Sequence, residues 1–96
     1  MLTITKKADT DSIIISLEGR LDTNTASQLE AELKEAPTTS TLVINLEKLE
    51  YISSAGLRVF LSAHKKMSGK MKIIHVGEVV MEIFEVTGFS DILDIE

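Results

Sequence analysis

The segment TLVINLEKLEYISSAGLRVF (residues 41–60) passes from a strand pattern to a helix pattern within a few residues, and this passage decides the fold. Its first part, residues 41–46, is a short run rich in β-branched and aliphatic side chains, which predicts a strand buried in a sheet. Its last part opens an apolar helical pattern that we expect to cover residues 55–67. The two adjacent hydroxyls, Ser53 and Ser54, therefore stand where the chain enters a helix.

The same alternation of strand and helix patterns continues on both sides of this segment. Strands are predicted over residues 2–7, 12–19, 41–46 and 71–76, with a short last one within 91–95, and further helices over 26–36 and 78–85. The first two strands are close enough in the chain to pair as a hairpin, and the second is apolar enough to be buried on both faces. Alternating strands and helices favour a mainly parallel sheet, because a parallel return needs a crossover connection. We expect an α/β fold with one domain over residues 1–96, in which helices pack against a mixed, mainly parallel sheet of four to five strands.

Composition limits the classes of function. A chain of 96 residues suffices for one hydrophobic core, and its net charge of -5 lacks the basic stripe that nucleic-acid backbones need. The absence of cysteine excludes disulfides and thiolate metal sites. No apolar run reaches membrane-spanning length, and the first seven residues alternate like a strand and do not resemble a signal peptide. We expect a cytoplasmic protein that contacts neither membrane nor nucleic acid directly.

Enzymatic readings find little support in the residues. A hydrolase nucleophile elbow has glycine two residues to either side of the serine, whereas Ser54 has Ile52 on one side and Gly56 on the other. His64 lies ten residues further along the predicted helix, and His75 lies near the exit of a strand. Two histidines at this separation match no metal-ligand spacing, and no glycine pattern fits a phosphate loop. The sequence therefore predicts no catalytic residue, no metal and no cofactor.

The hydroxyl pair admits two interpretations. Either Ser53 or Ser54 can cap the helix, which serine does well at this position. The same place also suits a phosphate, because free backbone N–H groups and the positive end of the helix dipole favour an anion there. Gly56, two residues after Ser54, leaves room for the backbone of a partner to approach.

The sequence resembles the STAS domains of bacterial anti-sigma factor antagonists. The resemblance covers essentially the whole chain and is carried by LEGRLDTNTASQLE (residues 17–30), LVINLEKLEYISSAGLRVFLSAHKKM (42–67) and HVGEVVMEIFEVTGFSDIL (75–93). The most specific part is a hydroxyl residue, a small residue, glycine and leucine after a buried strand. In these antagonists the phosphorylated residue lies two before the glycine, which implies Ser54. Ser53 stands where the best-known members have aspartate, and it is the second candidate acceptor.

The resemblance also implies a cycle and a binding surface. The unphosphorylated antagonist would bind a serine-kinase anti-sigma factor and release the sigma factor, the kinase would use ATP to phosphorylate the antagonist, and a metal-dependent serine phosphatase would restore it. The surface expected to bind the partner comprises Asp22, Thr23, Asn24, Ser53, Ser54, Gly56 and Leu57.

Several alternatives stay open at this point. Residues 22–24 either contact the partner or serve the start of the first helix, where Thr25 and Gln28 fit a capping box and Thr23 or Asn24 could cap instead. Leu57 and Leu61 either pack in the core or form an exposed docking patch. The whole chain is either a phosphorylation switch, or a STAS scaffold or ligand-binding module with an unmodified serine. A small hydrolase is disfavoured.

Overall fold

In the described part of the chain, five strands lie side by side in the order in which they occur in the sequence. The structure is a computed structural model and describes residues 1–37 and 39–96. The sheet order is β1-β2-β3-β4-β5, comprising β1 Leu2–Ala8, β2 Ser12–Leu21, β3 Thr41–Ile52, β4 Met71–Ile74 and β5 Asp94–Ile95. The first pair is antiparallel and the other three are parallel, which confirms the predicted hairpin and the mixed, mainly parallel sheet.

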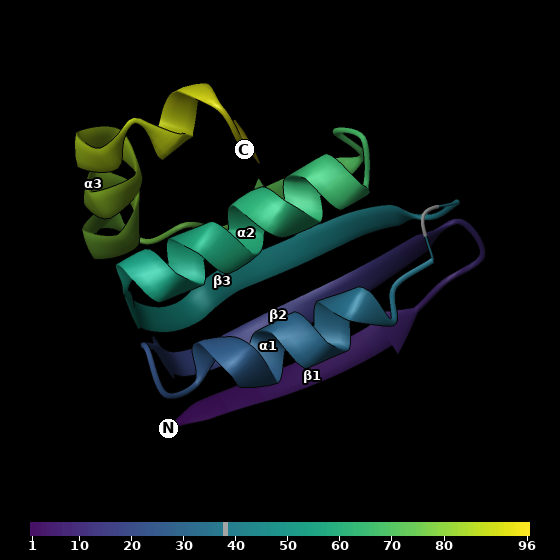
Figure 1. The fold of residues 1–96 in the computed structure, drawn as a ribbon, viewed down its shortest axis with the longest axis horizontal. Coiled ribbons are helices and arrows are strands. Elements are labelled where there is room, and N and C mark those ends of the chain that lie inside the picture. Colours follow the sequence, from purple (N-terminus) through teal and green to yellow (C-terminus); the bar gives the residue numbers. More distant parts are fainter. Residues whose placement is uncertain (38) are drawn as a thin grey trace.

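Three helices connect the parallel strands: α1 Ala26–Lys34, α2 Ser54–Lys66 and α3 Glu78–Thr87, with a short 3₁₀ helix η1 at Phe89–Asp91. Crossover connections are right-handed, and the strand order advances in one direction from β2 to β5, so all three helices fall on the same face of the sheet. Figure 1 shows α1 and α2 side by side across this face, with α3 at one end. The prediction that β2 is buried on both faces is therefore wrong, because Ile14, together with its neighbour Val43 on β3, lies half-buried on the uncovered face.

The core fills the space between the sheet and the helices. The predicted apolar face of α1 is buried, as is the face of α2 that contains Val59, Phe60 and Ala63. The rings of Phe60 and Phe84 approach to 6.2 Å between centroids with an interplanar angle of 47°, which joins α2 to α3. Within the described part of the chain, no helix has the length and apolar character needed to cross a membrane.

Several element boundaries differ from the sequence prediction by one or more residues, and two of these differences have clear local reasons. Strand β3 continues to Ile52, because its second half keeps pairing with β2 as far as the pair Leu21 and Ile52, with two register shifts on the way. Strand β4 ends at Ile74, since the following residue, His75, has a left-handed backbone with φ of 57°. Gly88, with φ of 82°, ends α3 in the left-handed conformation typical of glycine after a helix.

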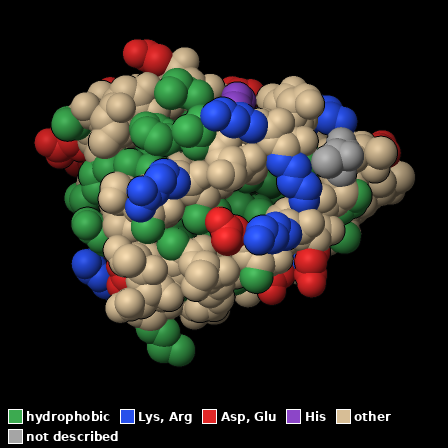
Figure 2. Space-filling view, viewed as in Figure 1, with side chains coloured by type: hydrophobic (Ala, Val, Ile, Leu, Met, Phe, Trp, Pro, Cys, Tyr) green, Lys and Arg blue, Asp and Glu red, His purple; other side chains and the backbone are tan. Residues whose placement is uncertain are grey.

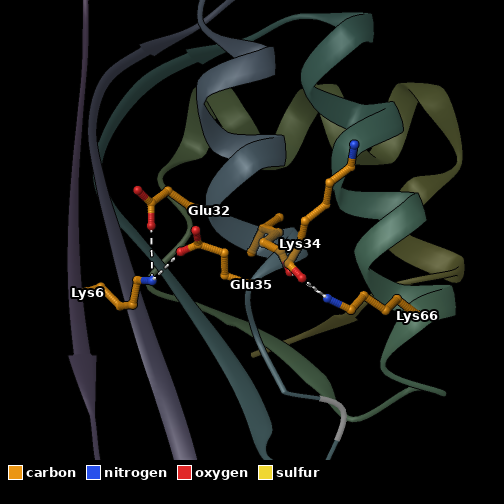
Figure 3. Close-up of polar contacts among 6 residues, drawn as sticks. Lys6, Glu32, Lys34, Glu35 and Lys66 are labelled. Carbon is orange, nitrogen blue, oxygen red and sulfur yellow. Dashed lines mark hydrogen bonds and ion pairs between the residues drawn. The ribbon is translucent and has the colours of Figure 1, made fainter.

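Polar contacts fasten α1 to the first strand. The ammonium of Lys6 on β1 lies 3.0 Å from the carboxylate of Glu32 and 3.8 Å from that of Glu35, both in the C-terminal part of the α1 segment (Figure 3). The hydrogen bond that the ammonium of Lys6 donates to the carboxylate of Glu32 raises the pKa of Lys6 above its ordinary value, so the lysine stays charged.

A lysine of α2 forms hydrogen bonds to the C-terminal end of α1. The ammonium of Lys66 donates to the backbone carbonyl oxygens of Leu33 at 3.0 Å and Lys34 at 2.7 Å (Figure 3). These carbonyls belong to the last turn of α1, whose acceptors have no partner within the helix. The contact fixes the spacing of the two helices that bear the candidate site.

Candidate functional site

Ser53 is the residue immediately before helix α2, and it has an extended backbone with φ of -95° and ψ of 172°. Its hydroxyl accepts a hydrogen bond from the backbone N–H of Gly56 at 3.3 Å, and its carbonyl oxygen accepts from the N–H of Leu57 at 3.0 Å. Ser53 is thus the residue that caps the helix, and its hydroxyl is half-buried and engaged.

Ser54, in contrast, is the first residue of α2 and is exposed. Among the described residues, none forms a hydrogen bond with its hydroxyl. The first turn of α2 contains no acidic side chain, and the first two turns carry a single charged residue, the exposed Arg58 at position i+4 from Ser54. The positive end of the helix dipole and this arginine both favour a negative charge on Ser54.

Glycine is required at position 56 for a packing reason that was not apparent from the sequence. A Cβ atom at this position would lie 2.7 Å from Cγ and 2.8 Å from Cδ2 of Leu21, and 3.0 Å from Cγ1 of Ile52. Glycine therefore allows α2 to pack closely on the ends of β2 and β3. The prediction that Gly56 leaves room for a partner is not supported, because the residue is buried and faces the core.

Leu57 is also part of the core. Its side chain is 4% exposed, so of the two alternatives core packing is the one the structure shows, and Leu57 offers no docking patch to a partner. Leu61, one turn further along α2, is half-buried. The apolar contact surface expected beside Ser54 does not come from these two leucines.

The loop before α1 is organised by Asp22. Its carboxylate accepts hydrogen bonds from the backbone N–H groups of Asn24 and Thr25, each at 3.0 Å. The hydrogen bond from the backbone N–H of Thr25 is the largest cause that holds the pKa of Asp22 below its ordinary value of 3.8. The hydrogen bonds from the Thr25 hydroxyl and from the backbone N–H of Asn24 lower it further. The predicted capping box is wrong, since the amide of Gln28 donates instead to the carbonyl oxygen of Leu2 at 3.2 Å.

Within this loop, one residue holds the backbone in its conformation and two residues are exposed to solvent. Asp22 is half-buried and committed to the loop, whereas Thr23 and Asn24 are exposed. The hydroxyl of Thr25 accepts from the N–H of Asp22 at 2.9 Å and lies 2.9 Å from the carbonyl oxygen of Arg20, to which it donates. The loop is therefore held in one conformation by its own side chains.

The loop and the start of α2 are brought together, as expected. The backbone N–H of Ser53 donates to the carbonyl oxygen of Leu21 at 2.8 Å, which joins the two segments directly. Between α1 and α2 runs a groove of about 430 Å³, lined by Thr23, Ala26, Ser27, Glu30, Ala55, Arg58, Val59 and Ser62. Sequence reasoning missed Arg58 and this groove; the only signal was the succession of small residues at the start of both helices.

The histidines lie away from the serines. Ser54 opens α2 and His64 lies in its last turn, roughly 15 Å apart at the helical rise of 1.5 Å per residue. His75 is exposed at the end of β4. Neither is placed to act as a base for Ser54, so this geometry gives no support to the hydrolase interpretation.

Comparison with known proteins identifies the family. The family model of the STAS domain matches residues 3–96. The chain belongs to the STAS domain family. The chain is 31% identical over 96 residues to an anti-sigma-B factor antagonist from Listeria monocytogenes, and the match covers 95% of this chain and 84% of that protein. The prediction of a STAS anti-sigma factor antagonist relative is confirmed.

Solved STAS structures show the same fold. The crystal structure of an anti-sigma factor antagonist from Mycobacterium paratuberculosis superimposes with a TM-score of 0.85 at 21% identity, covering 99% of this chain and 85% of that one. The antagonist SpoIIAA in its unphosphorylated form gives 0.79 at 17% identity, with 98% and 88% covered. Its phosphorylated form, from Bacillus, gives 0.73 at 18% identity, with 98% and 91% covered.

Proposed function

We propose that this STAS protein is an anti-sigma factor antagonist switched by phosphorylation of Ser54. In its unphosphorylated form it binds a serine-kinase anti-sigma factor, and the sigma factor is released. Phosphorylation ends this complex, and a serine phosphatase restores the binding form. The cycle runs in the cytoplasm, where ATP and the transcription machinery are found. The antagonist itself catalyses no step.

The observation that carries the proposal is that the two serines have different structural roles. Ser53 caps α2 with its hydroxyl, whereas Ser54 is exposed and its hydroxyl is free of any bond to the described residues. A serine kept only for capping would occupy the position of Ser53. Ser54 is thus the hydroxyl that a kinase can reach, and Ser53 becomes the weaker candidate acceptor.

The chemistry requires no catalytic group from this chain. The oxygen of Ser54 attacks the γ-phosphorus of ATP, a new O–P bond forms, and the bond to the ADP oxygen breaks. The hydroxyl proton leaves to a base of the kinase. In the reverse branch the phosphatase directs water to the phosphorus, which yields inorganic phosphate and the free serine.

Charge explains why phosphate would dissociate the complex. A phosphoserine carries about -1.5 to -2 charges and three acceptor oxygens. In the free protein, water, the helix terminus and Arg58 stabilise this charge. In a docked interface the phosphate would have to lose water, and an effect of about 4 kcal/mol suffices for a thousandfold weaker complex. No change of fold is needed.

The partner surface that we propose is narrower than the one predicted from the sequence. Ser54, Thr23 and Asn24 are exposed and lie together at one edge of the sheet, so we assign the contact to them. Gly56 and Leu57 act from the core by setting the position of α2. Asp22 holds the loop in shape and contributes through Thr23 and Asn24.

Calorimetric titration of the cognate anti-sigma factor with Ser54→Asp tests the proposal. Asp introduces about one negative charge, and we expect binding at least about tenfold weaker than that of the wild type. Ser54→Ala should bind like the wild type and should resist phosphorylation by the kinase. Ser53→Asp is the matched control for charge at the neighbouring position. A Ser54→Asp protein that binds as tightly as the wild type would overturn the proposal.

Mass spectrometry of phosphopeptides from the native cell separates the switch from a scaffold. Phosphate on Ser54 supports the switch. A chain that stays unmodified under every growth condition, while it still binds its partner, would show a STAS scaffold or ligand-binding module instead.

A further inference from the structure

The helix α3 carries an apolar stripe on its outer surface. Val79 is 61% exposed and Val86 is 80% exposed, and Ile83 between them is half-buried. Positions i, i+4 and i+7 fall on one side of an α-helix, so the three side chains form a continuous line. Ile92, which follows η1, is 48% exposed. The described residues contain four large hydrophobic side chains this exposed, and three of them belong to this C-terminal region.

This stripe is distinct from the face that holds α3 on the protein. Val80 and Phe84 are buried, and Phe84 packs on Phe60 of α2. At 100° per residue these two lie about 100° or more from Val79, towards the sheet. The helix thus has one apolar face that packs in the core and a second that faces solvent. Exposed apolar surface of this kind commonly marks a site of protein contact.

Charges on α3 are of one sign. The helix contains Glu78, Glu82 and Glu85 and no lysine or arginine. All three carboxylates are exposed, and within the described residues none of them forms a salt bridge. Helical spacing places them together along one side of the stripe. Figure 2 shows apolar side chains gathered over α3 and η1 with acidic ones at the margin, while lysines and arginines gather over α1 and α2.

The stripe lies near the candidate switch. Strands β3 and β4 are parallel, so α2 and α3 both begin at the same edge of the sheet (Figure 1). Ser54 opens the first of these helices, and Val79 lies in the first turn of the second. One partner that approaches this edge can therefore reach both.

We infer that the stripe of α3 is a second docking surface, which inserts into an apolar groove of a protein partner bordered on one side by lysine or arginine. Anchors at i, i+4 and i+7 are the pattern by which an amphipathic helix fills such a groove. A second copy of this chain does not fit, because it would bring six carboxylates together. Anionic lipid is disfavoured for the same reason.

This inference rests on the proposed function for the identity of the partner, which is the anti-sigma factor. The stripe adds affinity that phosphate on Ser54 does not remove directly. Binding should therefore have two components, one sensitive to charge at Ser54 and one sensitive to the apolar surface of α3.

The test is a binding titration of the purified cognate anti-sigma factor with the full chain carrying Val79→Ser and Val86→Ser. Both positions are exposed, so thermal unfolding should be unchanged, and we expect about tenfold weaker binding. Val43→Ser, a half-buried valine on the uncovered sheet face, is the matched control and should bind like the wild type. Equal affinity of the double variant and the wild type overturns the inference.

A second pair of variants tests the charge. Glu82→Gln with Glu85→Gln should weaken binding about threefold at low salt and by less at high salt, because salt screens exposed charges. Glu47→Gln with Glu50→Gln, exposed carboxylates on β3, should have no effect. An equal loss of affinity in both pairs of variants would show a general effect of net charge. It would overturn the inference that lysine or arginine borders the groove of the partner. If the wild type itself fails to bind, the proposed function fails together with this inference.

Discussion

The backbone N–H of Ser53 donates a hydrogen bond of 2.8 Å to the carbonyl oxygen of Leu21. The two residues are 32 positions apart, yet this bond makes the end of β2 and the start of α2 one unit. The exposed Thr23 and Asn24 follow Leu21, and the exposed Ser54 follows Ser53. The bond therefore fixes the position of the loop relative to the serine, and the partner contact that we propose would need no prior rearrangement of these two segments.

The close packing at Gly56 predicts that Gly56→Ala is destabilising. The new methyl group would lie under 3 Å from two atoms of Leu21, which is fully buried, so the surrounding core would have to shift. Such overpacking costs about 1–3 kcal/mol, of which the better helix propensity of alanine returns up to about 1 kcal/mol. Urea unfolding should show a net loss of about 1–2 kcal/mol. Gly77→Ala is the control for added volume, since no atom lies within 4 Å of its added Cβ; because Gly77 is the N-cap of α3, where glycine is preferred to alanine, it should still cost about 0.5–1 kcal/mol.

The two serines should differ in stability measurements. Ser53→Ala removes the hydroxyl that accepts from the N–H of Gly56 and should lower the free energy of unfolding by about 1 kcal/mol. Ser54→Ala removes an exposed hydroxyl and should change it by less than about 0.5 kcal/mol. Thermal or urea unfolding of the two variants side by side checks this. A larger loss for Ser54→Ala would contradict the assignment of the cap.

Asp22 should make stability depend on pH in the acid range. Its folded pKa lies below the ordinary value of 3.8, so folding favours the charged form. The contribution is fully present above the unfolded pKa and is lost as the pH falls through the folded pKa. Urea unfolding from about pH 6 to 2 should therefore show a steeper acid loss for the wild type than for Asp22→Asn. Parallel curves for the two proteins would refute the role of this carboxylate.

Lys66 should support the packing of α1 on α2. Lys66→Met keeps the length of the side chain but removes the donor to the carbonyls of Leu33 and Lys34, and should lower the free energy of unfolding by about 1 kcal/mol. Lys65→Met is the control, because Lys65 is exposed and its side chain contacts no carbonyl of α1 among the described contacts. Hydrogen exchange of the last turn of α1 should rise only in the Lys66 variant.

Much of the fold follows from local patterns. The apolar spacing of α1 and α2, the β-branched strands and Gly88 as the end of α3 are visible in the sequence, because each depends on neighbouring residues alone. The uncovered sheet face was not predicted, since a run such as residues 13–15 looks the same whether one or both of its faces are buried. Whether the second face is covered depends on the direction in which successive strands are added to the sheet, because a single direction places all the connecting helices on one face.

The candidate site was predicted in part for similar reasons. The serine at the helix start and the loop of residues 22–24 could be found from spacing and family resemblance. The purpose of Gly56 could not, because the atoms that exclude a side chain there belong to Leu21, far away in the chain. The bond from Gln28 to Leu2 likewise crosses 26 positions, and helix-capping rules do not reach that far.

The ends of the sheet bear on how the protein behaves at high concentration. A strand at the border of a sheet offers unpaired backbone groups on which another molecule can add a strand and begin to aggregate. Here β5 is limited to the two residues Asp94–Ile95, and β1 carries the charged Lys6 and Lys7. We expect these features to disfavour pairing between the sheet edges of two molecules, and so to keep the protein from aggregating as its concentration rises.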